Sequence, residues 1–178
     1  HVRCHGFYPG FLWENGEMVE IPGNEHVNCG VTYMKETPED RHRVETEEGR
    51  AVYSQDLFNE KIEAFIRTNA DPSTGSGKAR PFFLYHPSQL PHGPTAVPEL
   101  HPGVRDVEGV SLWEKEYASM ILRLDDTVGM IYSLLEELGI LDKTVIIFAS
   151  DNGHEPSYYT EEGRCSGGKV TQDGRKID

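Results

Sequence analysis

Residues 144–153 read T-V-I-I-F-A-S-D-N-G, and this stretch decides the fold. Val145 to Phe148 form a short apolar run of β-branched and aromatic residues, which predicts a strand buried on both faces of a parallel sheet. Asp151 and Asn152 follow within four residues, at the end of the strand where open α/β sheets place their ligands. A carboxylate beside a carboxamide suits Ca²⁺ or Mg²⁺. The Asp-Asn-Gly sequence is equally typical of a simple turn.

The chain before this strand predicts one long helix over residues 112–138. Ser111 and Glu114 have the spacing of a capping box, and Gly139 is a natural residue for the helix end. Apolar residues recur at helical spacing and predict one face packed on the sheet: Tyr117, Met120, Ile121, Leu124, Val128, Ile131, Leu135 and Leu138. Asp125 and Asp126, inside the helix, are expected to face solvent or to form a local ion pair.

Two further elements precede the long helix. Ser54 can cap a helix from Gln55 to about Thr68, with an inner face of Leu57, Ile62, Phe65 and Ile66. Residues 81–86 place five apolar or aromatic residues before a histidine and predict a second core strand. Residues 1–50 show little periodicity and predict loops with short strands. The pattern therefore predicts an α/β fold with a mostly parallel central sheet flanked by helices.

A long proline-rich loop runs from Pro87 to about Val110. Loops of this length inside compact domains are commonly functional, and prolines stiffen them by fixing φ. The loop contains His92, which is a candidate functional residue. A lone histidine is more often a polar surface residue, and that is the expectation for His26, His42, His86 and His101.

Four blocks of the chain together match one known family. The first, H-G-F-Y-P-G-F-L-W-E-N-G-E-M-V-E-I-P-G-N, spans residues 5–24, and Y-S-Q-D-L-F-N-E-K-I-E-A-F-I spans residues 53–66. The third, P-F-F-L-Y-H-P-S-Q-L-P-H-G-P-T-A-V-P-E, spans residues 81–99. The last joins Y-A-S-M-I-L-R-L-D-D-T-V-G, from residue 117, to L-G-I-L-D-K-T-V-I-I-F-A-S-D-N-G, from residue 138. In this order the four blocks resemble the sulfatase family of the alkaline-phosphatase-like superfamily, and the resemblance covers nearly the whole chain and implies a partial sulfatase sandwich.

The resemblance also implies roles for particular residues. Asp151 and Asn152 are expected to bind a divalent cation, usually Ca²⁺ with Mg²⁺ as the alternative. His92 is expected to lie near the sulfate and the leaving-group oxygen, as the catalytic residue of this segment. His5 matches a family histidine at the rim of the substrate site. These positions predict a site for a sulfated small molecule or glycan.

Two candidate substrate-binding residues follow the metal pair. Lys169 ends a Gly-Gly-Lys tract like that of the family's sulfate-binding lysine. The residues after Lys169 depart from the family pattern, so the alternative places that lysine later in the chain. His154 comes one residue after the pair, beyond Gly153, and is a substrate group, a group that supports the metal ligands, or a solvent-facing loop residue.

The family's nucleophile has no match in this chain. Sulfatases use a formylglycine made from the Cys or Ser of a C-x-P-S-R-like motif, and none of Cys4, Cys29 and Cys165 stands in such a motif. The amino-terminal aspartate pair and the early Lys/His pair of the family are also missing. We therefore expect residues 1–178 to be the central part of a single sulfatase catalytic domain, with a loop-rich segment at 1–50 and an α/β core segment at 51–178. By itself this part is expected to be inactive and to be either self-associated or marginally stable.

Composition limits the partners. The 178 residues are 37% hydrophobic, which fits one domain with a real core. A net charge of −13 argues against nucleic acid, because phosphate binding needs clustered Lys and Arg. No apolar run approaches the roughly 20 residues of a membrane span. The resemblance implies a periplasmic, secreted or lysosome-like location.

The resemblance implies hydrolysis of a sulfate ester, on a sulfated carbohydrate or an aryl sulfate. A formylglycine hydrate would attack sulfur, and His92 would donate a proton or hydrogen bond to the departing alcohol oxygen. Two alternatives remain open. One is a phosphomonoester or phosphonate hydrolase of the same superfamily, and the other is a non-catalytic sugar-binding relative.

Overall fold

The computed structural model describes residues 6–24, 51–70, 81–93, 95–151, 169–170 and 176–177. The chain divides into two units, His1–Thr144 and Val145–Asp178. The first unit contains β1 (Phe11–Glu14), β2 (Glu17–Glu20), α1 (Ser54–Ala70), α2 (Pro102–Arg105), α3 (Leu112–Glu137) and the short 3₁₀ helix η3 (Leu141–Lys143). The second contains β3 (Lys169–Val170) and β4 (Lys176–Ile177).

The chain enters the first unit through a β-hairpin. β1 (Phe11–Glu14) and β2 (Glu17–Glu20) pair antiparallel, with Trp13 opposite Met18. Asn15 and Gly16 connect them with φ angles of 53° and 89°. A two-residue type I′ turn needs positive φ at both positions, and Asn-Gly is the sequence that adopts it most readily. This hairpin agrees with the short strands predicted for the loop-rich segment.

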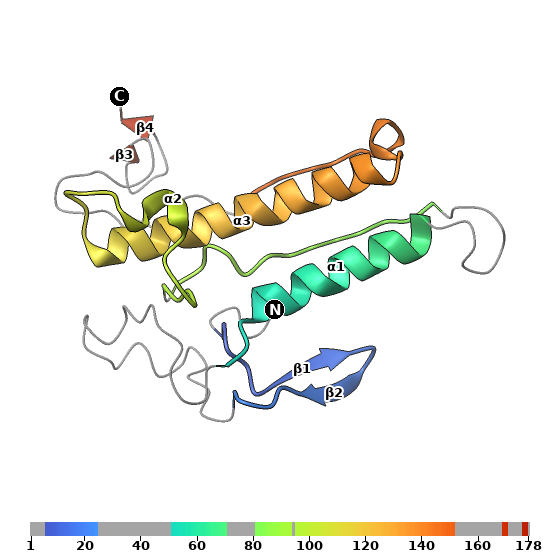
Figure 1. Ribbon diagram of the computed structural model, residues 1–178, viewed down its shortest axis with the longest axis horizontal. Coiled ribbons are helices and arrows are strands. Elements are labelled where there is room, and N and C mark those ends of the chain that lie inside the picture. The colour runs from blue at the N-terminus through green and yellow to red at the C-terminus, as the bar shows by residue number, and fades with distance from the viewer. Residues whose placement is uncertain are drawn as a thin grey trace. The chain divides into compact units, whose positions relative to one another are not determined.

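Two long helices form the frame of this unit (Figure 1). α1 spans Ser54–Ala70 and α3 spans Leu112–Glu137. The predicted capping box is present, since Ser111 Oγ accepts from the Glu114 N–H at 3.2 Å and the Glu114 carboxylate accepts from the Ser111 N–H at 2.7 Å. Gly139 has φ of 66° just beyond the end of α3. Both predicted helices are therefore confirmed. Among the described residues, no helix is long and apolar enough to cross a membrane.

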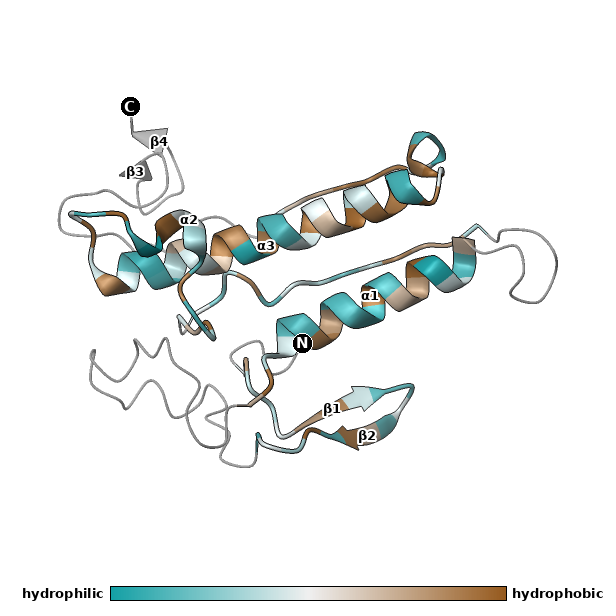
Figure 2. Ribbon diagram, viewed as in Figure 1, coloured by the Kyte–Doolittle hydropathy of each residue, from teal (hydrophilic) through white to brown (hydrophobic). Residues whose placement is uncertain are grey.

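Residues 81–90 run as an extended segment between α1 and α3 (Figure 1). Phe82 and Leu84 pack with an apolar cluster formed by Ile62, Ile66, Leu134 and Leu135. The alternate side chains Phe83 and Tyr85 are 86% and 74% exposed. This alternation is the two-residue period of extended backbone, with one face covered by the two helices. Figure 2 shows the brown hydrophobic residues of this segment beside the two-coloured, amphipathic helices.

The predicted parallel sheet is not present in the described residues. Neither residues 81–86 nor residues 144–150 pair as strands there, and the sheets of the described part are two antiparallel hairpins, β1–β2 and β3–β4. β3 (Lys169–Val170) pairs with β4 (Lys176–Ile177) in the second unit. In the same unit Val145 and Ile147 are each 85% exposed, so the apolar run predicted as buried is not buried here. A strand needs a neighbour to supply its hydrogen bonds, and an apolar pattern alone does not supply one.

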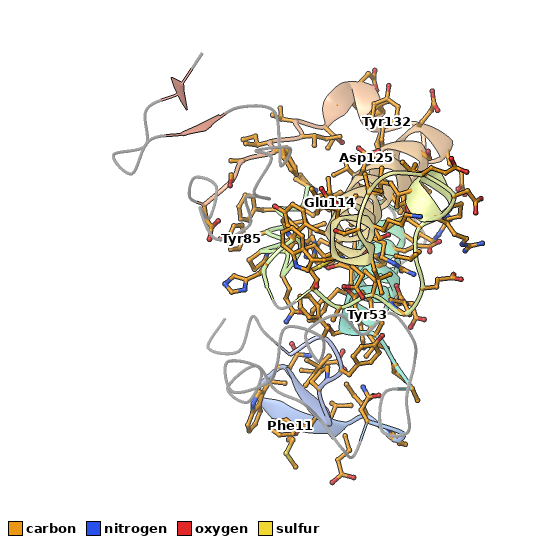
Figure 3. The ribbon with its side chains drawn as sticks, turned by 90° about the vertical axis from the view of Figure 1, so that its left-hand side faces the viewer. Phe11, Tyr53, Tyr85, Glu114, Asp125 and Tyr132 are labelled. Carbon is orange, nitrogen blue, oxygen red and sulfur yellow. The ribbon has the colours of Figure 1, made fainter. Side chains whose placement is uncertain are left out.

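A second apolar cluster lies where the chain enters α1. Tyr53 stacks on Phe7 at 5.7 Å between ring centroids and meets Tyr8 edge-on at 5.4 Å. Its hydroxyl donates to the Ala96 carbonyl at 2.8 Å, and the Arg123 guanidinium lies 5.5 Å from its ring centroid. Burial raises the pKa of the Tyr53 phenol, so this residue stays neutral. In Figure 3 Tyr53 lies near the start of α1, on the side toward the hairpin that carries Phe11.

The inner face of α3 is more polar than its apolar pattern predicts. Glu116, Ser119 and Thr127 are buried, whereas Ile121, predicted on the packed face, is 41% exposed. The buried side chains make hydrogen bonds: Thr95 Oγ1 donates to Glu116 at 3.1 Å, and Ser119 Oγ accepts from the His101 N–H at 2.9 Å. The loop before α3 therefore lies against its polar stripe.

Burial gives Glu116 a measurable pH dependence. Desolvation raises the pKa of its carboxyl from 4.5 to about 7, against the smaller lowering effect of the Thr95 hydrogen bond. Because the folded state binds this proton more tightly than the unfolded state, stability is lost as the pH rises from about 4.5 through about 7. The free energy of unfolding of Glu116→Gln, relative to the wild type, should increase over that range by up to about 3 kcal/mol. Urea denaturation at a series of pH values measures it.

Thr95→Val is the companion variant for this prediction. Without the hydroxyl donor the pKa of Glu116 should rise further, so the loss of stability with pH should become larger. A difference between Glu116→Gln and wild type that does not change with pH would contradict the buried position of Glu116.

The exposed aromatic side chains of residues 81–86 predict self-association of the 178-residue chain. Phe83 and Tyr85 lie on the same side of an extended segment, which is a surface that favours edge-to-edge and apolar contacts. Phe83→Ser combined with Tyr85→Ser should weaken the association, measured by sedimentation velocity over a concentration series. Tyr132→Ser, at a 49% exposed position on α3, is the matched control and should change it little. A wild-type chain that stays monomeric would show this expectation to be wrong.

Candidate functional site

His92 lies in a tight turn at the start of the proline-rich loop. Its backbone N–H donates to the Gln89 carbonyl at 2.8 Å, and the Leu90–Pro91 peptide bond within the turn is cis. The His92 side chain is exposed. Its Nδ1 lies 2.6 Å from the Gly93 carbonyl oxygen. A carbonyl oxygen can only accept, so Nδ1 carries a proton and donates it, and Nε2 is the ring nitrogen that can exchange a proton with a ligand.

A buried polar network holds the chain that leads into this turn. Gln55 is 1% exposed, and its Nε2 donates to Asn59 Oδ1 at 2.9 Å. Ser88 Oγ lies 3.4 Å from Gln55 Oε1 and accepts from the Leu90 N–H at 3.1 Å. Because Gln55 is on the first turn of α1, this network connects the helix to the residues just before His92.

His86 belongs to the same network. Its Nε2 lies 3.4 Å from Gln55 Nε2, and its ring contacts Phe58 at 6.4 Å between centroids. Burial lowers the pKa of the imidazole and favours its neutral form. The expectation that His86 is only a surface residue is therefore wrong. The alternation of residues 81–86 turns its side chain to the same side as Phe82 and Leu84.

The far end of the loop is held by α3. His101 caps the short helix α2 (Pro102–Arg105), with Nδ1 accepting from the Gly103 N–H at 3.0 Å. Its Nε2 is 3.1 Å from Asp126 Oδ2. Since Nδ1 accepts, Nε2 carries the proton and donates it to Asp126. Asp126 is 62% exposed, as the solvent-facing expectation had it, and its partner is distant in sequence rather than local. His101 has a structural role that the sequence did not reveal.

The second unit contains the predicted metal ligands. Asp151 is exposed, and Asn152 lies outside the described residues. The carboxylate of Asp151 is a donor that suits Ca²⁺ or Mg²⁺, but Ca²⁺ takes six to eight oxygen ligands. No group of three or more His, Cys, Asp or Glu side chains that could hold a metal occurs within the described ranges. The donor type therefore fits a cation, while the coordination shell is not formed by these residues.

The remaining predicted site residues have little or no described geometry. His5 and His154 lie outside the described residues, and Lys169 is the first residue of β3. The structure therefore gives side-chain contacts for His92 and an exposed position for Asp151 among the predicted residues. It adds Gln89 and Gln55 near His92, which sequence patterns did not single out because their side chains bond residues from distant parts of the chain only after folding.

The chain is similar to known sulfatases. The family model described as Sulfatase matches residues 3–176. The N-acetylgalactosamine-6-sulfatase of Mus musculus is 33% identical over 119 residues, which are 67% of this chain and 20% of that protein. The human protein of the same name is 27% identical over 165 residues, 93% of this chain and 27% of that protein. The N-acetylgalactosamine-6-O-sulfatase of Bacteroides thetaiotaomicron is 38% identical over 95 residues, 53% of this chain and 17% of that protein.

The chain thus spans about a fifth of the length of these curated relatives. No solved structure matches it significantly. The family match nevertheless extends over almost all of the 178 residues, including the turn that contains His92 and the Asp151 position. The chain therefore belongs to the sulfatase family, whose fold is of the α/β, alkaline-phosphatase-like class.

Proposed function

We propose that the protein is a sulfuric ester hydrolase and that this chain carries part of its active site. The observation that carries the proposal is the exposed His92 in a turn fastened to the buried frame, within a chain of the sulfatase family. The names of the similar proteins favour a sulfated carbohydrate as substrate, with an aryl sulfate as the alternative. The proposal includes the exported or lysosome-like location that the family resemblance implies.

His92 is proposed as the general acid. The hydrogen bond from Nδ1 to the Gly93 carbonyl fixes the orientation of the ring and places the exchangeable proton on Nε2. With both nitrogens protonated, Nε2–H can donate to the alcohol oxygen as the S–O bond breaks. This donation matters most when the alcohol is a poor leaving group, because a strongly basic oxide cannot depart without a proton.

Asp151 and Asn152 are proposed to hold the divalent cation, Ca²⁺ or Mg²⁺, together with ligands from outside this chain. Such a cation offsets negative charge on the sulfate oxygens. Lys169, His154 and His5 are proposed as further contacts to the sulfate or the sugar. A formylglycine that is not encoded in these 178 residues would supply the nucleophile.

The first test in the intact enzyme is His92→Ala. The value of kcat should fall far more for an alkyl or sugar sulfate than for an activated aryl sulfate, because the aryl oxide needs little protonation. Steady-state kinetics on a series of sulfate esters with graded alcohol pKa measures this effect. The slope of log kcat against the pKa of the leaving alcohol should be steeper for His92→Ala than for the wild type.

His101→Asn is the matched control for this test. It alters a second histidine of the same loop, and asparagine can still cap α2. It should leave the leaving-group dependence unchanged. Equal losses of kcat for all esters in His92→Ala would remove the general-acid role and leave only sulfate positioning.

The second test concerns the cation. Asp151→Ala should abolish most activity of the intact enzyme with little change in folding, because Asp151 is exposed and no described packing depends on it. The 178-residue chain should bind Ca²⁺ only weakly, since it is proposed to supply just two ligands. Activity assays compare Asp151→Ala with the wild-type intact enzyme, and isothermal titration calorimetry measures Ca²⁺ binding by the 178-residue chain. Sub-micromolar calcium affinity of the 178-residue chain alone would refute the proposed half-site.

A further inference from the structure

The side chain of Gln89 is held at both ends of its amide group. Ser54 Oγ lies 2.8 Å from Gln89 Oε1, and Gln89 Nε2 lies 3.3 Å from the Gly6 carbonyl oxygen. Ser54 is fully buried and Gly6 is buried, so both hydrogen bonds have one partner removed from water. Hydrogen bonds of this kind are costly to break, because a buried group is left without its partner.

The orientation of the amide follows from its partners. The Gly6 carbonyl oxygen can only accept, so the NH₂ group of Gln89 must face it. The carbonyl oxygen of the Gln89 side chain then faces Ser54, whose hydroxyl must donate. The pair therefore has one arrangement of donors and acceptors, and any change in either residue alters it.

These bonds join three parts of the chain. The Ser54 N–H donates to the Phe7 carbonyl at 2.8 Å, so Ser54 binds Phe7 through its backbone and Gln89 through its side chain. The Gln89 backbone carbonyl accepts from the His92 N–H at 2.8 Å. The first residue of α1 is thus connected to the turn of His92 through a single glutamine.

We infer that Gln89, fixed by Ser54 and Gly6, is a positioning residue that sets the place of the His92 turn for catalysis. The inference rests on the proposed general-acid role of His92. The same glutamine also binds Gly6, the neighbour in sequence of the candidate rim residue His5. A shift of Gln89 therefore moves the attachment of the His92 turn.

The backbone bond alone does not explain this placement. The Gln89–His92 bond closes a four-residue turn, which can move as a unit if its first residue is free. Ser88 also contacts Gln55, but at 3.4 Å, a distance at which a hydrogen bond is weak. The 2.8 Å bond to Ser54 is the shorter side-chain attachment of this turn to α1.

Two substitutions separate the bonds. Gln89→Glu keeps the size of the side chain but places a carboxylate oxygen opposite the Gly6 carbonyl, so the bond to Gly6 is lost. Ser54→Ala removes the donor to Gln89 and leaves the backbone bond to Phe7 in place. Ser119→Ala is the matched control: it also deletes a fully buried hydroxyl, but one that holds the His101 end of the same loop.

The experiment uses the intact enzyme and two independent measurements. The first is hydrogen exchange of the His92 amide, which should become faster in Ser54→Ala and Gln89→Glu and stay unchanged in Ser119→Ala. The second is kcat on the graded sulfate esters. In both test variants kcat should fall about two- to tenfold for the ester with the poorest leaving group, and less for activated esters. This is the range expected for the loss of one neutral hydrogen bond. KM should change little.

Double variants decide whether the effect passes through His92. In a His92→Ala background, Ser54→Ala should cause no further loss of kcat, because residues that act as a unit are not additive. The same loss with and without His92 would show a merely structural effect and overturn the inference. Unchanged His92 amide exchange in both test variants would also overturn it.

Failure of the proposed function has a different signature. If His92→Ala shows no dependence on the leaving group, the general-acid role is refuted by that single variant. If His92→Ala shows the dependence but Ser54→Ala and Gln89→Glu keep the wild-type kcat, only the positioning role of Gln89 is overturned.

Discussion

The packing of residues 81–90 between α1 and α3 is the constraint on which the rest of the first unit depends. Phe82 and Leu84 contact Ile62 and Ile66 from one helix and Leu134 and Leu135 from the other. Removing this much aliphatic and aromatic surface from water is the main stabilising contribution available to a unit with so little sheet. The segment thereby fixes where the following turn, with His92, leaves the frame.

The loop after this segment is held by apolar and polar contacts together, since its Ala96 and Val97 are buried in the cluster that contains Tyr53 and Met120. Its backbone groups need partners, because a loop that lies against buried helix faces cannot leave its N–H and C=O groups without hydrogen bonds. Tyr53 satisfies the Ala96 carbonyl and Ser119 satisfies the His101 N–H. Two of the buried polar residues of α3, Glu116 and Ser119, therefore bond the loop that crosses them, whereas the third, Thr127, bonds Asn59 of α1. An apolar stripe at those positions would leave the loop with unsatisfied groups.

The same arrangement separates two histidines that have structural partners from the candidate functional histidine. His86 and His101 both use their ring nitrogens within the frame, one beside Gln55 and the other between Gly103 and Asp126. His92 differs, since its Nδ1 bonds the adjacent Gly93 and its side chain is exposed. Three histidines within sixteen positions of one another therefore have different chemistry because they have different neighbours, and residue type alone does not distinguish them.

Local signals in the sequence determined the two long helices and the hairpin turn. The Ser111–Glu114 capping box, Gly139 and the Asn15–Gly16 turn act through neighbouring residues only, so they could be read without the rest of the chain. The similarity of whole blocks gave the family and the candidate roles of His92 and Asp151. The tertiary structure alone decided that Gln55, Glu116 and Thr127 are buried and that Gln89 joins Ser54 to Gly6. It also decided that residues 81–86 lie on helices without pairing in a described sheet. Burial of a polar group and pairing of a strand both depend on partners from distant positions, and periodicity along the chain carries no information about those partners.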